Sequence, residues 1–298
     1  MKKYIFLFIL LYACAREEEN KYWSSATPLP YQVAYFGYTS DINGFYIFGG
    51  DTSSNDYSTS RMIIYNGTYK ISDTLNAPLH LKNSCIASYN NKIYIFGGYI
   101  ANTPTNNFFL YDINSNTYQD LGNLPFNAGG CFAVVLNNRI YIIVGANTTS
   151  FYEFNPSNNT FTQKASLTYS RDGLCAIVLN NQIYAIGGGN NKVEAYDLTT
   201  NSWIEKKSLD ISLKYHACEV LDGKIYVFGG QVGSSISSKV FSYDPNSDSW
   251  TYITDMKTPR KGLGASRVGN EIYVYGGIDD NNKITNIVEV FSISPIAF

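Results

Sequence analysis

The segment KIYIFGG at residues 92–98 decides the fold, because close copies of it recur along the chain. Each copy is a short run of β-branched and aromatic residues that ends in glycine, a pattern typical of a buried strand followed by a turn. A period between roughly 20 and 50 residues indicates a repeat architecture. The six copies are GFYIFGG (44–50), KIYIFGG (92–98), RIYIIVG (139–145), QIYAIGG (182–188), KIYVFGG (224–230) and EIYVYGG (271–277).

A second motif follows the glycine pair and consists of two aromatic residues seven positions apart, as in Tyr111/Tyr118 and Tyr196/Trp203. The residues between them, such as INSNT and LTTNS, are turn formers. An apolar segment such as CAIVL (175–179) precedes the glycine motif and predicts another strand. Each repeat therefore supplies four antiparallel strands, which we name a, b, c and d in chain order, with the glycine pair at the end of strand b.

Six repeats of four strands predict an all-β fold, a six-bladed β-propeller. The glycine pair and the spaced Tyr and Trp residues resemble kelch repeats, and this resemblance covers residues 21–298. The last repeat ends without a d strand, whereas Trp23 and the Leu-Pro after it match a d strand and its exit. We therefore expect residues 21–26 to complete the sixth blade and close the ring, which hides strand edges that would otherwise promote aggregation.

The first residues predict an export signal. Lys2 and Lys3 precede an apolar stretch from Tyr4 to Ala13, which is too short to cross a bilayer, where about 20 residues are needed, and is typical of a secretory signal. The residues LYAC that end at Cys14 resemble a bacterial lipobox, which implies acylation of that cysteine. The alternative is an ordinary cleaved signal with an incidental cysteine.

These features predict a signal peptide at 1–13, a lipidated and solvated tether at 14–20 and the propeller at 21–298. The protein is then exported to the cell envelope, either the periplasm or the cell surface, and contacts the membrane only through the lipid anchor. Four more cysteines, spaced like the repeats, lie at nearly equivalent positions of different blades: Cys85, Cys131, Cys175 and Cys218. Equivalent positions in separate repeats seldom approach within bridging range, so we expect small buried hydrophobic residues and no disulfides.

Composition excludes several function classes. The 22 Lys and Arg residues against 24 Asp and Glu give a net charge of −2, and no basic run marks a nucleic-acid contact, so no nucleic-acid partner is expected. No CxxC or Cys/His metal spacing and no phosphate-binding glycine loop occurs, so we expect neither metal nor cofactor. A copper oxidase of the galactose-oxidase type is disfavoured, because His80 and His216 are the only histidines and fall in different blades.

The expected oligomeric state of the protein is a monomer.

The repeated residues predict scaffold, so function is expected where the repeats differ. In an up-and-down blade the b–c loops and the d–a linkers share one face, and these loops vary, whereas the a–b and c–d turns on the other face are short and alike. We expect ligand contacts where the linkers carry charged or aromatic residues around the mouth of the central channel: Lys82, Arg171, Lys214, Tyr215, His216 and Arg260. The alternative is that these charges pair with one another and cap loops.

Two functions remain open. A non-enzymatic recognition module would bind a protein or carbohydrate ligand through the b–c/d–a face. The alternative is a sugar mutarotase or epimerase, because the chain resembles the sialic acid mutarotase family in blade number and export. That resemblance implies an acidic sugar, which Arg171 and Arg260 would bind. Glu153, Glu194 and Glu289 fall in c strands, where blade structure explains them, so no catalytic residue is assigned.

Overall fold

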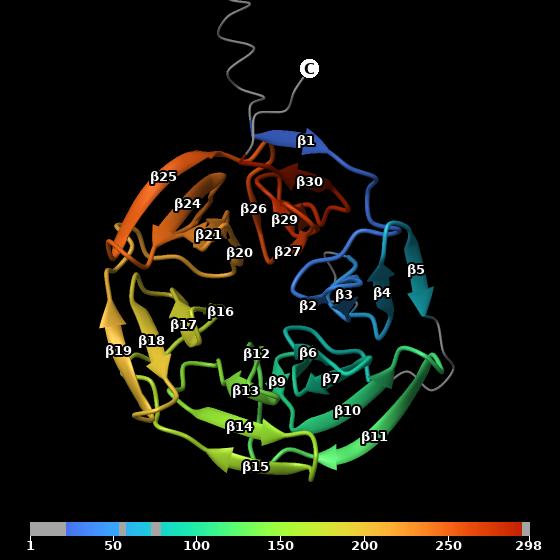
Figure 1. Cartoon of the computed structure of the whole chain (residues 1–298). Coiled ribbons are helices and arrows are strands. Elements are labelled where there is room, and N and C mark those ends of the chain that lie inside the picture. The colour runs from blue at the N-terminus through green and yellow to red at the C-terminus, as the bar shows by residue number, and fades with distance from the viewer. Residues whose placement is uncertain (1–21, 54–57, 73–78, 294–298) are drawn as a thin grey trace, which may run out of the picture.

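The computed structural model describes residues 22–53, 58–72 and 79–293, and the predicted signal peptide, tether and Cys14 lie outside these ranges. Six sheets of four antiparallel strands are arranged in a ring, as Figure 1 shows, and hollows lined by their a strands form a central channel. The predicted six-bladed β-propeller is therefore confirmed. Within the described ranges no helix is long and apolar enough to cross a membrane.

Each blade presents its a strand to the channel and its d strand to the outer rim (Figure 1). In blades 1 to 3 the strands a to d are β2 (Gly37–Asp41), β3 (Gly44–Phe48), β4 (Met62–Tyr65), β5 (Tyr69–Ser72); β6 (Cys85–Tyr89), β7 (Lys92–Phe96), β10 (Asn107–Asp112), β11 (Thr117–Asn123); and β12 (Phe132–Leu136), β13 (Arg139–Ile143), β14 (Phe151–Asn155), β15 (Thr160–Gln163). In blades 4 to 6 they are β16 (Cys175–Leu179), β17 (Gln182–Ile186), β18 (Val193–Asp197), β19 (Ser202–Lys206); β20 (Ala217–Leu221), β21 (Lys224–Phe228), β24 (Lys239–Asp244), β25 (Ser249–Asp255); and β27 (Gly264–Val268), β28 (Glu271–Tyr275), β30 (Val288–Phe291), β1 (Trp23–Ser25).

The N-terminal strand closes the ring as expected. β1 pairs antiparallel with β30, and Trp23 lies opposite Phe291. The indole is 2% exposed and packs between the rings of Phe291 in its own blade and Phe228 in blade 5, at centroid distances of 5.2 and 6.1 Å. Blade 6 is thus built from both ends of the described chain, and its outermost strand is fixed by a buried aromatic residue.

The glycine pairs are scaffold, as predicted. Gly187 and Gly188, directly after β17, have φ values of 60° and 91°, which favour glycine. A Cβ atom on Gly187 would lie 2.8 Å from the carbonyl oxygen of Leu213 in the linker to the next blade. The pair therefore allows neighbouring blades to approach closely.

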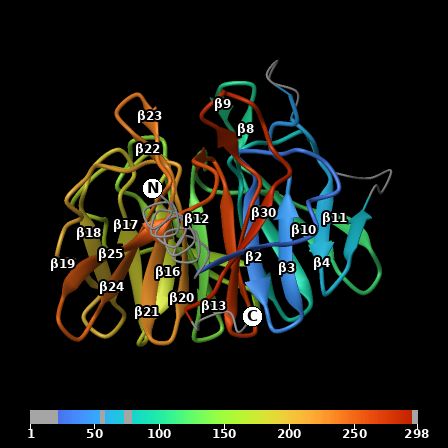
Figure 2. The same ribbon diagram turned by 90° about the horizontal axis from the view of Figure 1, so that it is seen from above.

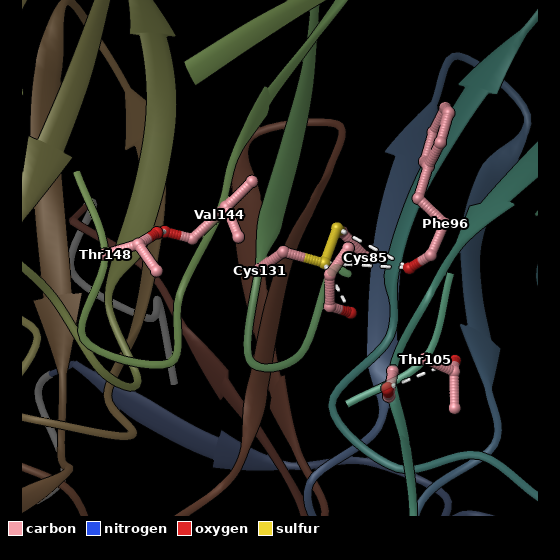
Figure 3. The surroundings of a disulfide bond; sticks show 8 residues. Cys85, Phe96, Thr105, Cys131, Val144 and Thr148 are labelled. Carbon is pink, nitrogen blue, oxygen red and sulfur yellow. Dashed lines mark hydrogen bonds between the residues drawn. A yellow bond between two sulfur atoms is a disulfide. The ribbon is translucent and has the colours of Figure 1, made fainter. Parts of the chain in front are cut away.

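The prediction about the cysteines is wrong, because the structure contains two disulfides that join neighbouring blades. Cys85 bonds to Cys131 with a Cα–Cα distance of 5.3 Å, and Cys175 bonds to Cys218 at 6.1 Å. In Figure 3 the first bridge links blades 2 and 3, and both sulfur atoms lie near the carbonyl oxygen of Phe96, at 3.7 and 3.6 Å.

The reason is the convergence of the a strands around the channel. Cys85 is the first residue of β6, whereas Cys131 immediately precedes β12. Cys175 is the first residue of β16, whereas Cys218 is the second of β20. A shift of one residue between neighbouring a strands brings each pair within the Cα–Cα separation that a disulfide spans, about 4.4–6.8 Å.

Candidate functional site

The b–c loops and the d–a linkers lie on one face of the ring, as predicted. Isolated β-bridges join a linker residue to a b–c loop residue in several blades, for example Lys82 to Tyr99 and Lys214 to Gln231. Two b–c loops form the ribbons β8 (Tyr99–Ile100) with β9 (Thr103–Pro104) and β22 (Gln231–Val232) with β23 (Ser235–Ile236). Figure 2 shows both ribbons projecting from the same side of the ring.

A belt of backbone hydrogen bonds surrounds the channel at this face. The amide of one linker residue donates to the carbonyl of the equivalent residue in the preceding blade, for example from Tyr35 N to Gly262 O at 2.9 Å and from Tyr215 N to Gly173 O at 2.7 Å. Five of the six blade junctions carry such a bond, including the junction between blades 6 and 1. The belt residues are Tyr35, Asn83, Gly130, Gly173, Tyr215 and Gly262.

All six belt residues have positive φ, between 50° and 66°. Glycine adopts this conformation readily and asparagine is tolerated, but a tyrosine in it is an outlier that costs free energy. Tyr35 and Tyr215 have φ values of 54° and 56° where three other blades carry glycine. Their rings meet edge-to-face with centroids 5.2 Å apart. The two tyrosines therefore carry a backbone cost that the scaffold does not require, a pattern found at functional sites.

These rings lie at a hollow of about 460 Å³, which we call the mouth. The Tyr215 hydroxyl donates to Asp172 Oδ2 at 3.0 Å, and Lys82 Nζ lies 3.3 Å from Asp51 Oδ2. Burial raises the pKa of Tyr35 to about 12, and the charges of Asp51 and Asp172 make smaller contributions in the same direction. The Tyr35 hydroxyl is therefore protonated near neutral pH. The mouth residues are Tyr35, Asp51, Lys82, Asn83, Tyr99, Asn102, Ala146, Asn147, Asp172 and Tyr215.

Arg171 and Arg260 do not reach the mouth, which corrects their expected placement. Their side chains are 0% exposed, and they pair with Glu194 at 2.7 Å and Glu289 at 2.9 Å. Each guanidinium also donates to backbone carbonyls of its own blade; Arg260 Nη1, for example, donates to Gly276 O at 3.0 Å. The reason is that the partners of both guanidinium groups lie inside the blade, where the side chains are fully buried, so neither arginine can contact a ligand at the mouth.

The remaining predicted residues divide into two groups. Lys82 and Tyr215 line the mouth, and Lys214 Nζ lies 5.1 Å from the centroid of the Tyr215 ring beside it. His216 lies deeper, in the wall of the channel, and is 3% exposed. Burial, and then the charge of Arg171, lowers the pKa of His216 to about 3, so its ring is neutral near neutral pH. Ligand contacts by Lys82, Lys214 and Tyr215 stay a prediction.

A sequence model of the KLHDC2/KLHL20/DRC7 Kelch-repeats domain matches residues 19–188 and 150–295. The chain belongs to the kelch-repeat family. The kelch propeller is a fold that protein-interaction modules use. Within the described ranges no group of three or more His, Cys, Asp or Glu residues could hold a metal ion.

Several kelch proteins are similar to this chain. Kelch-like protein 35 of Mus musculus is 25% identical over 293 residues, which cover 96% of this chain and 42% of the mouse protein. The F-box/kelch-repeat protein At1g67480 of Arabidopsis thaliana is 35% identical over 101 residues, which cover 32% of this chain and 27% of the plant protein. The chain thus spans less than half the length of these relatives. The solved structure of YjhT has a TM-score of 0.77 at 13% identity and covers 91% of this chain and 97% of its own, a likeness of fold.

The wall of the central channel includes a glutamate that the sequence analysis did not single out. Glu219 lies in the middle of β20 and lines the channel wall. Burial raises its pKa to about 7, although hydrogen bonds from the backbone amides of Val220 and Arg267 oppose this shift. A signal was present, because Glu219 stands in the middle of ACEVL (217–221), whereas the a strands of the two preceding blades, FAVVL (132–136) and CAIVL (175–179), are apolar throughout.

Proposed function

We propose that this kelch propeller is an exported, lipid-anchored and non-enzymatic recognition module that binds a protein or carbohydrate ligand at the mouth. The observation that carries the proposal is the pair Tyr35 and Tyr215, held at positive φ where the other blades have glycine or asparagine. Tyrosine is enriched at binding hot spots because it combines a large apolar ring with a polar hydroxyl. The backbone cost at both sites is then offset by ligand contact.

The chemistry of the mouth favours a protein loop over a carbohydrate. Tyrosine rings next to Asp172 and Lys82 combine apolar area with charges of both signs, which is typical of protein interfaces. Asp172 forms no ion pair with any residue of the described ranges, so a partner's lysine or arginine has a carboxylate to meet. Kelch-repeat relatives also support a protein partner. Neutral amides such as Asn147 suit sugar hydroxyls, and carbohydrate is the other outcome of the test.

Replacing Tyr35 or Tyr215 with glycine tests the mouth. Glycine keeps the positive φ and removes the ring, so Tyr35→Gly and Tyr215→Gly are expected to weaken binding by about tenfold or more, in the range of an aromatic hot spot, while the melting temperature is unchanged or rises. The ligand is first selected from a peptide library and a glycan array, and its affinity is then measured by calorimetry. Tyr252→Ala, on an outer strand, is the control and should bind like the wild type.

Wild-type affinity in both glycine variants would contradict this proposal, because it would remove the mouth as the binding site. Selection of glycans with no peptide would leave the site in place and would decide for a carbohydrate ligand over a protein.

Export is supported by the two disulfides, because such bonds persist in oxidising compartments and are rare in the cytosol. The anchor is tested by changing the predicted acylation site. Cys14→Ser is expected to move the protein from the membrane fraction to the soluble fraction and to abolish labelling by a fatty-acid probe. Unchanged fractionation and labelling would remove the anchor from the proposal.

Mutarotation of an acidic sugar has no support in the geometry of the mouth. That alternative relied on Arg171 and Arg260 as partners of a sugar carboxylate, and both guanidinium groups are already paired inside the blades. It stays a prediction, and the rate of anomer exchange measured by NMR would decide it.

A further inference from the structure

The central channel continues below the mouth as a stack of hollows that share wall residues. Tyr38 and Phe132 line both a small upper chamber and a lower chamber of about 210 Å³. Their rings meet edge-to-face with centroids 5.4 Å apart and narrow the channel between the two chambers. Ser40 and Glu219 line both the lower chamber and the opening on the a–b/c–d face. The lower chamber is therefore reached from the face opposite the mouth.

The lower chamber has one apolar wall and one polar wall. Blades 3 and 4 supply apolar side chains, which include Phe132, Val134, Ile177 and Val178. Blades 1, 2, 5 and 6 supply polar groups, which include Tyr38, Ser88, Glu219 and Ser266. Two of the hydroxyls are already used, because Ser88 donates to Asp41 Oδ2 at 2.7 Å and Ser266 bonds to the Tyr275 hydroxyl at 2.7 Å.

Two polar groups of this wall keep unused bonding capacity. The Glu219 carboxylate accepts from the amides of Val220 at 2.8 Å and Arg267 at 3.0 Å, and it forms no ion pair with any described residue. A carboxylate can accept about four hydrogen bonds. The buried Tyr38 hydroxyl has no partner in hydrogen-bonding geometry among the described residues. Both Tyr38 and Glu219 line the lower chamber, and burial, followed by the charge of Glu219, raises the pKa of the Tyr38 hydroxyl, although the backbone amide of Cys218 opposes this shift.

We propose that the lower chamber binds a small molecule that carries an ammonium group on an apolar body. The ammonium group donates to the Glu219 carboxylate and to the Tyr38 hydroxyl oxygen, and the apolar body lies against Val134 and Ile177. A buried carboxylate without an ion pair is costly, and a cationic ligand supplies the missing partner. This site is separate from the mouth and does not depend on the function proposed there.

The charge of Glu219 makes this binding depend on pH. Its pKa of about 7 means that the empty chamber holds a protonated carboxyl below pH 7. Two tyrosines near it, Tyr38 and Tyr275, stay neutral between pH 5 and 8, because burial raises the pKa of both hydroxyls. The charge of Arg267 also acts on the carboxyl and opposes the rise of its pKa. A cationic ligand must displace the proton, so its affinity should rise about tenfold per pH unit up to pH 7 and level off above it.

Three probes of matched shape test the proposal on the purified protein: benzylamine, benzyl alcohol and benzoate. Titration calorimetry and NMR line-shape changes at pH 8 should show saturable binding of benzylamine, at least about tenfold weaker binding of benzyl alcohol, and none of benzoate. Binding of benzylamine should weaken at pH 5.5. Equal affinity for the three probes, or no binding of benzylamine at millimolar concentration, would overturn the proposal.

Two variants locate the site. Glu219→Gln should abolish binding of benzylamine and raise the melting temperature more at pH 8 than at pH 5, because it removes a carboxylate that is destabilising when ionised. Tyr38→Phe keeps the ring and should weaken binding several-fold, which covers the case in which the glutamine variant fails to fold. Glu271→Gln, at an exposed position of the same face, is the matched control and should bind like the wild type. Wild-type affinity in both Glu219→Gln and Tyr38→Phe would also overturn the proposal.

Discussion

Replacing Arg171 with leucine alone should lower the free energy of unfolding by about 3–5 kcal/mol, because it leaves Glu194 buried without its partner. Both side chains are almost fully buried, and one Glu194 oxygen also accepts from the amide of Thr168 at 2.8 Å. A carboxylate in this position has no access to water. The loss is therefore expected to appear fully in equilibrium unfolding by denaturant.

The other blades show how the two positions of Arg171, in the d–a linker, and Glu194, in the c strand, are filled without charge. The Arg/Glu pair occurs in two blades. The equivalent apolar or aromatic pairs in the other four are Val33/Ile63, Leu81/Phe109, Ala128/Tyr152 and Leu213/Phe241. The two positions therefore change together, which follows from the cost of one buried charge without the other.

The double variant Arg171→Leu/Glu194→Phe copies the blade 2 pair and is the matched control. It should recover most of the lost stability, because replacing a buried ion pair by apolar residues of similar volume is often nearly neutral. A double-mutant cycle measures the coupling between the two positions. If the single and double variants lose the same amount, the ion pair does not account for the effect.

Removing the Cys85–Cys131 disulfide should cost about 4 kcal/mol, since the bridge closes a loop with a sequence separation of 46 residues in the unfolded chain. The variant Cys85→Ala/Cys131→Ala leaves no unpaired thiol from this bridge, and thermal unfolding without reducing agent measures the change. The Cys175→Ala/Cys218→Ala variant should lose a similar amount, with a separation of 43 residues. Because the bridges join different pairs of blades, the two losses should add. A wild-type melting temperature in either variant would show that its bridge does not form.

The blade architecture could be predicted from the repeats because each strand has a local signature. The b strands end in glycine, and the missing d strand of the last repeat is supplied by Trp23. Side-chain direction could not be predicted in the same way. Arg171 and Arg260 are placed correctly in the linkers, but the choice between solvent and the blade interior depends on Glu194 and Glu289, far along the chain.

The cysteines and the channel show the same limit. Spacing in the chain places Cys175 and Cys218 in neighbouring blades, but only the convergence of β16 and β20 at the channel brings their Cα atoms to 6.1 Å. The importance of Tyr35 becomes visible only when the linkers of the six blades are aligned, because the equivalent residue has positive φ in every blade. The residues next to Tyr35 in the chain do not indicate this backbone conformation.

The two ends of the described chain lie side by side on the outer rim, since Ser292 N, near the last described residue, donates to Tyr22 O at 3.0 Å. The ring is therefore suited to circular permutation, with a short linker joining these two points. New ends between blades 3 and 4 would leave both disulfides inside continuous segments, because neither bridge crosses that junction. A reporter domain could then be attached on the side of the ring opposite blade 6.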